Sequence, residues 1–381
     1  MNFALQMMDS ALKTMKFVLK MMDFAAPSQV LQALLSAFGK YQAKNLLILF
    51  DAVATLAEAV GEALAHPDIV SALVPAVLAR WEACRDDERT LIPCTECLSA
   101  LTGVMGELML PYVEPLYGRI MRLVHARTTA LADPNLDPPE FEYPCVNLDL
   151  LSSMLEALGT QMMPLLESTG GIAVILTAAS NDPHTEMKRV LFAVIGDLAK
   201  SCWELLGPHA AQVLPLLLDH FNPSYVAACN NATWAVGEIV TQIGTGSDLA
   251  FLSQVVARLS PILAPYNPHT SRIRYHRTVV DTASITLGRL AEVSAATVAG
   301  HPELESSLLE GWCCALRNSR DGDDKEHATQ GLLAVLQANP AAAAGKVGFV
   351  CDVFCSWSLA KLQVSTRIPP LKFHRIRCVA L

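Results

Sequence analysis

Acidic side chains recur at one position of several helical segments. When six segments are aligned on the residue near their C-terminal ends, five carry an acid ten residues earlier, where composition gives about one acid in ten. The six residues at this position are Asp51, Glu96, Asp149, Asp197, Trp234 and Asp281. Carboxylates that repeat in this way can pair with the Lys and Arg side chains of an extended basic partner.

A second set of acids lies seven residues further along three of these segments, at Glu58, Glu156 and Glu204. Seven residues bring an α-helix back to within about 20° of the same direction, so the two sets share one face. The sequence therefore predicts an acidic track with Trp234 set within it. Beside this tryptophan, Asn231 could hydrogen-bond a peptide backbone while the indole stacks on an arginine or an apolar side chain.

A solvated helix face is the competing interpretation of this track, because acids are favoured in the first turn of any helix. A lone tryptophan is likewise more often a core residue. Two observations favour a binding surface. Asp51 follows the apolar run from Leu46 to Phe50 instead of opening its helix, and acids seven residues later cannot belong to a first turn.

The positions of these acids depend on a long series of helices. Apolar residues recur with a period near 3.6 in segments of roughly 12 to 22 residues, and no segment alternates as a strand would. Short turns such as Asn181-Asp182-Pro183 separate the segments. One longer interruption, Ala132 to Pro144, contains four prolines and four acids and is expected to be an exposed loop. The pattern predicts an all-α chain of antiparallel helix pairs.

The helical segments also repeat along the chain. Five of them end at a glycine and a sixth has Ala291 in the same place; the glycines are Gly61, Gly106, Gly159, Gly207 and Gly244. The spacings of 45, 53, 48, 37 and 47 residues lie close to the ~40 to 47 of HEAT and armadillo units. Tetratricopeptide repeats have a fixed ~34 residues and a Trp-Gly-Tyr pattern that this chain lacks. We therefore predict a HEAT-repeat superhelical solenoid.

Composition excludes several classes of protein. A chain of 381 residues that is 52% hydrophobic and 17% charged, with a net charge of -9, is neither disordered nor a general nucleic-acid binder. Its eleven cysteines lack the spacing of a disulfide framework, and the single CxxC at Cys94 and Cys97 is interpreted as buried thiols of a helix. Acids interrupt the most apolar stretch, Asn45 to Ala65, so membrane insertion is not expected.

Motifs of common enzymes are absent from the sequence. It contains no GxxxxGK[ST], HExxH or GxSxG pattern, and its ten histidines show no ligand spacing. We therefore expect a protein that is not an enzyme and has neither a cofactor nor a metal site.

Six stretches of the chain carry a family resemblance. They are 38–61 (FGKYQAKNLLILFDAVATLAEAVG), 147–159 (NLDLLSSMLEALG), 196–203 (GDLAKSCW), 222–239 (NPSYVAACNNATWAVGEI), 285–290 (ITLGRL) and 316–321 (LRNSRD). Together they resemble the C-terminal half of the transportins, nuclear import receptors of the karyopherin-beta family. The resemblance extends from about Phe38 to Trp357. It implies a superhelix of stacked HEAT repeats that carries cargo bearing a basic nuclear localisation signal ending in Pro-Tyr.

The resemblance also implies roles for particular residues and partners. Residues expected to bind the basic part of the signal are Asp51, Thr55, Glu58, Glu96, Asp149, Glu156 and Asp197. Asn231 and Trp234 are expected to contact its N-terminal part. The implied partners are cargo proteins, nucleoporins and Ran-GTP, which releases cargo and binds mainly through repeats that precede this sequence. The receptor is expected to shuttle between cytoplasm and nucleus, with no direct nucleic-acid partner.

Three regions follow from the extent of the resemblance. Residues 1–37 are a loosely matching helical segment, 38–357 are the HEAT-repeat array, and 358–381 are a divergent basic tail. A second function remains open at this point, because a HEAT-repeat scaffold protein without signal recognition would use the same solenoid.

Overall fold

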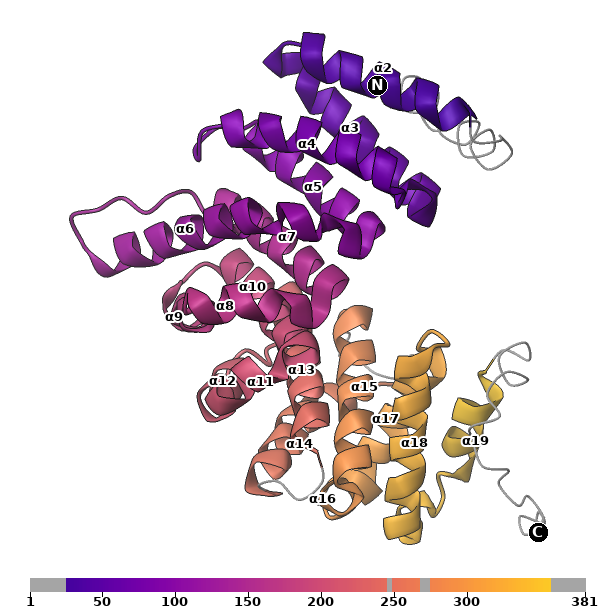
Figure 1. Ribbon diagram of the computed structural model, residues 1–381. Helices are drawn as coiled ribbons and strands as arrows, with labels where there is room; N and C mark the ends of the chain where they lie inside the picture. Colours follow the sequence, from indigo (N-terminus) through magenta and orange to yellow (C-terminus); the bar gives the residue numbers. More distant parts are fainter. Residues whose placement is uncertain (1–24, 245–248, 268–274, 358–381) are drawn as a thin grey trace. The chain divides into compact units, whose positions relative to one another are not determined.

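The computed structural model describes residues 25–244, 249–267 and 275–357, and these residues form helices joined by turns and loops (Figure 1). The expectation of an all-α chain is confirmed for these ranges. Contacts divide the chain into two compact units, Met1–Leu216 (unit 1) and Leu217–Leu381 (unit 2). Residues 1–24 and the basic tail 358–381 lie outside the described residues.

Unit 1 consists of two layers of helices. The helices of its first layer are α3 (Ala43–Val60), α5 (Leu91–Met105), α7 (Glu142–Leu158) and α10 (Thr185–Ser201). Each of these packs against the next. The second layer contains α2 (Ala25–Lys40), α4 (Pro67–Ala83), α6 (Val113–Ala132), α8 (Met163–Ser168), α9 (Gly171–Asn181) and α11 (Trp203–Leu206), and α12 (Ala210–Leu218) spans the boundary between the units. The loop between α6 and α7, residues 133–141, is largely exposed as expected. It is shorter than the expected Ala132 to Pro144, because Ala132 ends α6 and residues 142–144 begin α7, where Tyr143 and Pro144 are buried.

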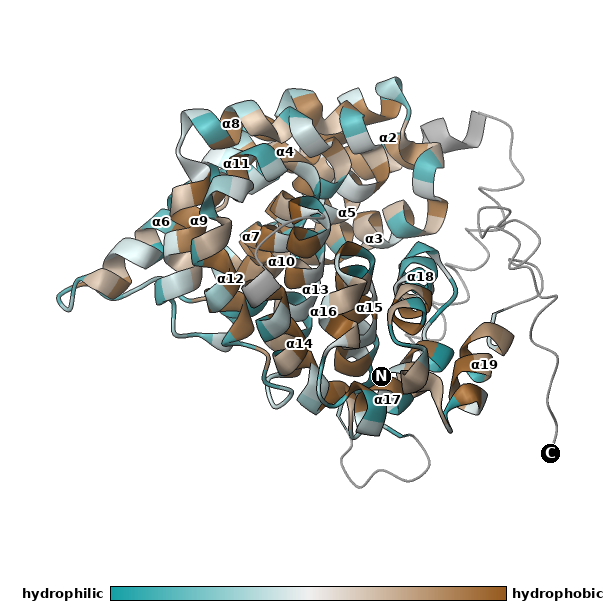
Figure 2. Ribbon diagram, turned by 90° about the horizontal axis from the view of Figure 1, so that it is seen from below, coloured by the Kyte–Doolittle hydropathy of each residue, from teal (hydrophilic) through white to brown (hydrophobic). Residues whose placement is uncertain are grey.

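Unit 2 repeats this arrangement with α13 (Val226–Ile243), α15 (Arg277–Val293) and α18 (Asp323–Ala338) stacked in order. Its other helices are α14 (Leu249–Leu263), α16 (Ala295–Ala299), α17 (Leu309–Asn318) and α19 (Val347–Cys355). Helix α19 is hydrophobic in Figure 2, yet only Val353 within it is fully buried. Both units therefore bury their cores between helix pairs, which is the HEAT-type arrangement predicted from the repeat.

Short 3-10 segments link several of the pairs: Gly61–Leu64, Gly106–Tyr112, Gly159–Met162, Gly207–His209 and Pro340–Ala343, with one π-helical turn at Leu304–Leu308. Residues 25–37, expected to be a loosely matching segment, form most of α2, which packs on α3 and α4.

Four of the five predicted terminal glycines cap their helices. Gly61, Gly106, Gly159 and Gly244 follow α3, α5, α7 and α13 directly and have φ values of 62°, 57°, 55° and 73°. A residue without Cβ adopts this left-handed region at no steric cost, and its amide can then close the last helical turn. The glycines thus recur because the ends of these helices need a positive φ.

The repeat fails at α10 and is shifted at α15. Helix α10 ends at Ser201, so Gly207, which begins a 3-10 segment after α11, does not cap it. The cap residue Cys202 has φ -134°, which any residue can adopt, and no glycine marks the break. Helix α15 continues to Val293, so Ala291 lies inside it. Gly207 and Ala291, on which these two helices were aligned, therefore do not mark their ends.

Candidate functional site

Acids from three adjacent helices of unit 1 meet on one surface. Helix α5 packs against both α3 and α7. Asp51 and Glu58 are exposed on α3, Glu96 is exposed on α5, and Asp149 is half-buried on α7. Glu58, Glu96 and Asp149 line one groove, and the charges of Asp149 and Asp51 both act on Glu96.

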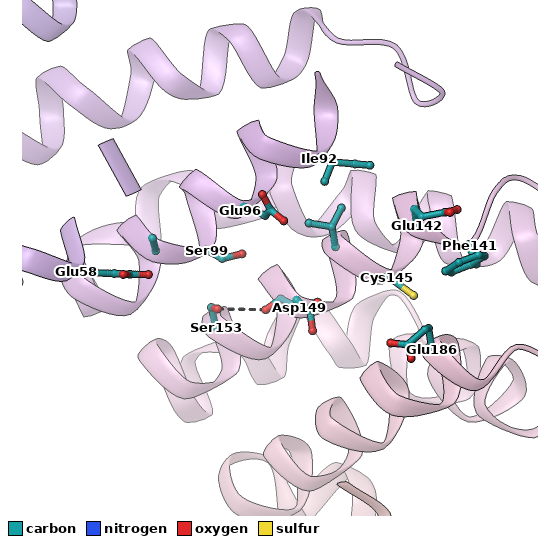
Figure 3. Close-up of a pocket in the computed structure, with 12 residues that line it drawn as sticks. Glu58, Ile92, Glu96, Ser99, Phe141, Glu142, Cys145, Asp149, Ser153 and Glu186 are labelled. Carbon is teal, nitrogen blue, oxygen red and sulfur yellow. Dashed lines mark hydrogen bonds between the residues drawn. The ribbon is translucent and has the colours of Figure 1, made fainter. Parts of the chain in front are cut away.

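A groove with a volume of about 510 Å³ lies at the centre of this surface (Figure 3). We call it the acidic groove and define it by its lining residues Glu58, Ile92, Glu96, Ser99, Ala100, Phe141, Glu142, Cys145, Val146, Asp149, Ser153 and Glu186. Figure 3 shows Glu96 and Asp149 near its middle, between Glu58 at one end and Glu186 at the other. Five of the twelve lining residues are acidic and none is basic. The groove therefore favours a cationic occupant.

The carboxylates of the groove repel one another. Burial raises the pKa of Glu96, and the charges of Asp149 and Asp51 raise it further. Burial also raises the pKa of Asp149, and the opposing attraction of Arg189 does not cancel that effect. Since a raised pKa means that the ionised form is disfavoured, a bound cation that stabilises these carboxylates would offset part of this cost.

The other residues expected on α3 and α7 lie beside the groove. Thr55 donates a hydrogen bond to the Asp51 backbone carbonyl at 2.8 Å, so its hydroxyl oxygen is still able to accept from a ligand. Glu156 is exposed on α7, two turns after Asp149. Neither residue lines the groove.

Asp197 does not belong to this exposed surface. Its side chain is only 3% exposed, and it accepts a hydrogen bond from the Ser152 hydroxyl of α7. Asp197 therefore lies in the contact between α10 and α7. The prediction of a surface position for Asp197 is therefore wrong. Asp281 lies on α15 of unit 2, where it pairs with Arg277 one turn earlier.

Sequence reasoning missed three residues at the groove. Glu142 and Glu186 lie in the first turns of α7 and α10, where an acid is commonly a helix-dipole residue. Arg189 reaches from α10 to both Asp149 and Glu186. The spacing of three residues between Glu186 and Arg189 is a sequence signal for an ion pair on one helix face. The alignment of α10 on Gly207 instead selected Asp197.

Asn231 and Trp234 lie on α13 of unit 2, three residues apart and therefore on one side of the helix. Asn231 accepts a hydrogen bond from the amide of Asn230 at 3.2 Å, and the Thr282 hydroxyl donates to Asn230 at 2.6 Å. Trp234 is half-buried. These polar contacts fix the Asn pair on the surface of unit 2, whereas the acidic groove belongs to unit 1.

The remaining candidate features are structural. Cys94 and Cys97 are fully buried in α5, and burial raises the pKa of the Cys97 thiol to about 12, so both remain thiols. Within 25–244, 249–267 and 275–357, no group of three or more His, Cys, Asp or Glu side chains could hold a metal ion. In the same ranges no single helix has the length and apolarity of a membrane span. One pair of segments bent by 87°, Glu142–Ser168 and Gly171–Asn181, meets that criterion by length and composition alone.

Curated relatives identify the chain more closely than its fold does. No protein-family model matches it. It is 35% identical to human and mouse transportin-1 over 333 residues, which cover 86% of this chain and 36% of each relative. The chain is a relative of transportin. It is also 31% identical to importin subunit beta-2 of Schizosaccharomyces pombe over 320 residues, 82% of this chain and 34% of that protein. The transportin-like chain thus spans about a third of the length of the curated relatives it matches.

A solved structure supports the fold of this transportin relative. Importin beta, crystallised in ammonium sulfate, matches with a TM-score of 0.58 over 86% of this chain and 37% of the importin beta chain, at 16% identity. At that identity the match concerns the fold alone, and it agrees with the HEAT-type helix pairs of both units.

Proposed function

We propose that this chain is the cargo-binding part of a nuclear import receptor and that its acidic groove binds the basic part of a nuclear localisation signal. The observation that carries the proposal is the cluster of mutually repelling carboxylates on α3, α5 and α7 of a transportin relative. We propose a signal of the Pro-Tyr type because the resemblance to the transportins implies such a signal. Transport through the nuclear pore with help from nucleoporins, and release by Ran-GTP, complete the proposed cycle between cytoplasm and nucleus.

The groove suits an extended basic segment because its acids are spread from Glu58 at one end to Glu186 at the other. Each exposed acid-base contact contributes only about 0.2 to 1 kcal/mol, so affinity arises from several contacts acting together. Such charges also accelerate encounter with a cationic partner. Trp234 and Asn231 of unit 2 offer a contact region for the N-terminal part of a signal, by stacking and by hydrogen bonds to its backbone.

Charge reversal at two exposed acids tests this function. We expect the double variant Glu58→Lys and Glu96→Lys to weaken binding of a fluorescently labelled basic Pro-Tyr signal peptide at least tenfold, about 1.4 kcal/mol. Two attractions become repulsions, and both side chains are exposed, so the fold should persist. Fluorescence anisotropy at low and high salt measures the change, and wild-type binding should weaken as salt rises.

The matched control reverses an exposed acid of the other layer, Glu114→Lys on α6, and should leave affinity within about twofold. Equal binding by wild type, control and double variant would contradict signal recognition at the groove and favour a scaffold protein built on the same repeats.

Lowering the pH should weaken this binding, because the groove carboxylates then take up protons. The pKa values of Glu96 and Asp149 are raised in the free protein. A bound cation stabilises the ionised forms and lowers these pKa values, so binding releases protons. Affinity should therefore fall as the pH drops from neutrality through the raised pKa values. Anisotropy titrations across this range measure the slope, and Glu96→Gln should flatten it. A slope unchanged by Glu96→Gln would show that other groups control the pH dependence.

A further inference from the structure

An arginine of the protein itself already forms ion pairs with two carboxylates of the acidic groove. The Arg189 guanidinium lies with Nη1 3.4 Å from Asp149 Oδ1 and Nη2 3.3 Å from Asp149 Oδ2. Its Nε donates to Glu186 Oε2 at 2.9 Å. Both carboxylates line the groove. Asp149 and Glu186 thus form a two-carboxylate subsite in which a guanidinium is bound.

The bond between Arg189 and Asp149 is loose. Charge-assisted N–H···O bonds are commonly 2.7–2.9 Å long, whereas both contacts to Asp149 exceed 3.2 Å. The side chains are 29% and 43% exposed, so water weakens their attraction. Burial still holds the pKa of Asp149 above its ordinary value despite this arginine. Asp149 therefore remains able to gain from a better-placed cation.

We infer that Arg189 is an internal competitor, which holds the Asp149–Glu186 subsite in the free protein and is displaced from Asp149 when an arginine of a bound basic peptide enters. The inference rests on the proposed function and adds a residue that limits affinity and selects the ligand. An incoming guanidinium can place two parallel N–H groups on Asp149, which a lysine ammonium cannot do. The subsite should therefore prefer arginine to lysine at the matching peptide position.

A purely structural role for Arg189 is less well supported. Helices α7 and α10 are also joined by the contact of Cys145 with Met187, at 3.4 Å between their sulfur atoms, and by the hydrogen bond from Ser152 to Asp197. These contacts lie among buried side chains of the two helices. Loss of the two partly exposed ion pairs of Arg189, with Asp149 and Glu186, should leave this packing in place.

The test is a double-mutant cycle on peptide binding. Arg189→Met keeps the aliphatic stem and removes the charge, and we expect it to bind an arginine-containing basic Pro-Tyr peptide at least threefold more tightly than wild type. In the Asp149→Asn background the same change should give no gain, because the competitor acts through Asp149. Arg189→Lys keeps the charge but loses the two-pronged contact with Asp149, so its gain should be smaller than that of Arg189→Met.

A general effect of net charge is separated by Arg85→Met, which removes an exposed arginine paired with Asp87 outside the groove. This variant should bind as wild type does. Unchanged or weaker binding by Arg189→Met would overturn the inference and show that Arg189 positions Asp149 for the ligand. A gain that persists with Asp149→Asn, or that Arg85→Met reproduces, would overturn it as well. Absence of binding by every protein, wild type included, would refute the proposed function and the inference together.

Discussion

Replacing Asp182 by alanine is expected to destabilise unit 1 by about 3–5 kcal/mol, because the change removes the carboxylate partner of a buried guanidinium. Arg127 of α6 and Asp182, directly after α9, are 7% and 3% exposed. The Arg127 Nε lies 2.6 Å from Asp182 Oδ2, and Nη2 lies 3.3 Å from Oδ1. This pair is fully enclosed, unlike the ion pairs of the acidic groove.

Asp182 also fixes the turn into α10. Its Oδ1 accepts a hydrogen bond from the His184 backbone amide at 2.9 Å, and Lys188 binds the last carbonyls of α9, those of Ala179 and Ser180. Alanine at position 182 removes the acceptor for the His184 amide as well as the charge partner of Arg127. The start of α10, which carries Glu186 and Arg189, should then lose its fixed position beside α7.

Urea unfolding followed by circular dichroism measures the loss, and hydrogen exchange in α7 and α10 assigns it to unit 1. The apolar double replacement Arg127→Met and Asp182→Leu should recover much of the stability, since well-packed apolar pairs often equal buried ion pairs. The exposed pair of Arg85 and Asp87 supplies the control, because Asp87→Ala should change stability little. A loss below about 1 kcal/mol for Asp182→Ala would mean that water reaches Arg127.

The sequence revealed those parts of the fold that only certain residues can form. A helix end that needs positive φ selects glycine, so Gly61, Gly106 and Gly159 locate the ends of α3, α5 and α7, and the acids counted back from them share a surface. The break after α10 lies at Cys202, whose negative φ does not require glycine. The local sequence therefore gave no sign of this helix end, and Asp197 was assigned to the wrong side of its helix.

Contacts across helices were beyond a single sequence for a different reason. Arg189 meets Asp149 forty residues away in the chain, and that meeting depends on the rotation of α10 against α7. A periodic pattern gives the buried face of each helix but not the angle at which two faces meet. The acidic groove was therefore predictable as a set of like charges on α3, α5 and α7, whereas its internal counter-ion was not.

In unit 2, a change from glycine to alanine at Gly331 is expected to destabilise by up to about 3 kcal/mol, although alanine is the better helix former. A Cβ at position 331 of α18 would lie 2.1 Å from the Gly288 carbonyl oxygen of α15. Conversely, a Cβ at Gly288 would lie 2.3 Å from Ala328 Cα. The two backbones approach so closely that no side-chain rotation relieves the overlap, and the helices must move apart.

The sign of this effect follows from two opposing terms. Alanine in place of a helical glycine stabilises by up to about 1 kcal/mol, and overpacking a tight contact typically destabilises by about 1–3 kcal/mol. Gly103→Ala isolates the first term, because nothing lies within 4 Å of a Cβ at that exposed position of α5. Urea unfolding should show a gain for Gly103→Ala and a loss for Gly331→Ala, with faster hydrogen exchange in α15 and α18 for the latter. Equal gains for both variants would mean that α15 and α18 separate at little cost, and the close glycine contact would then not determine how this helix pair packs.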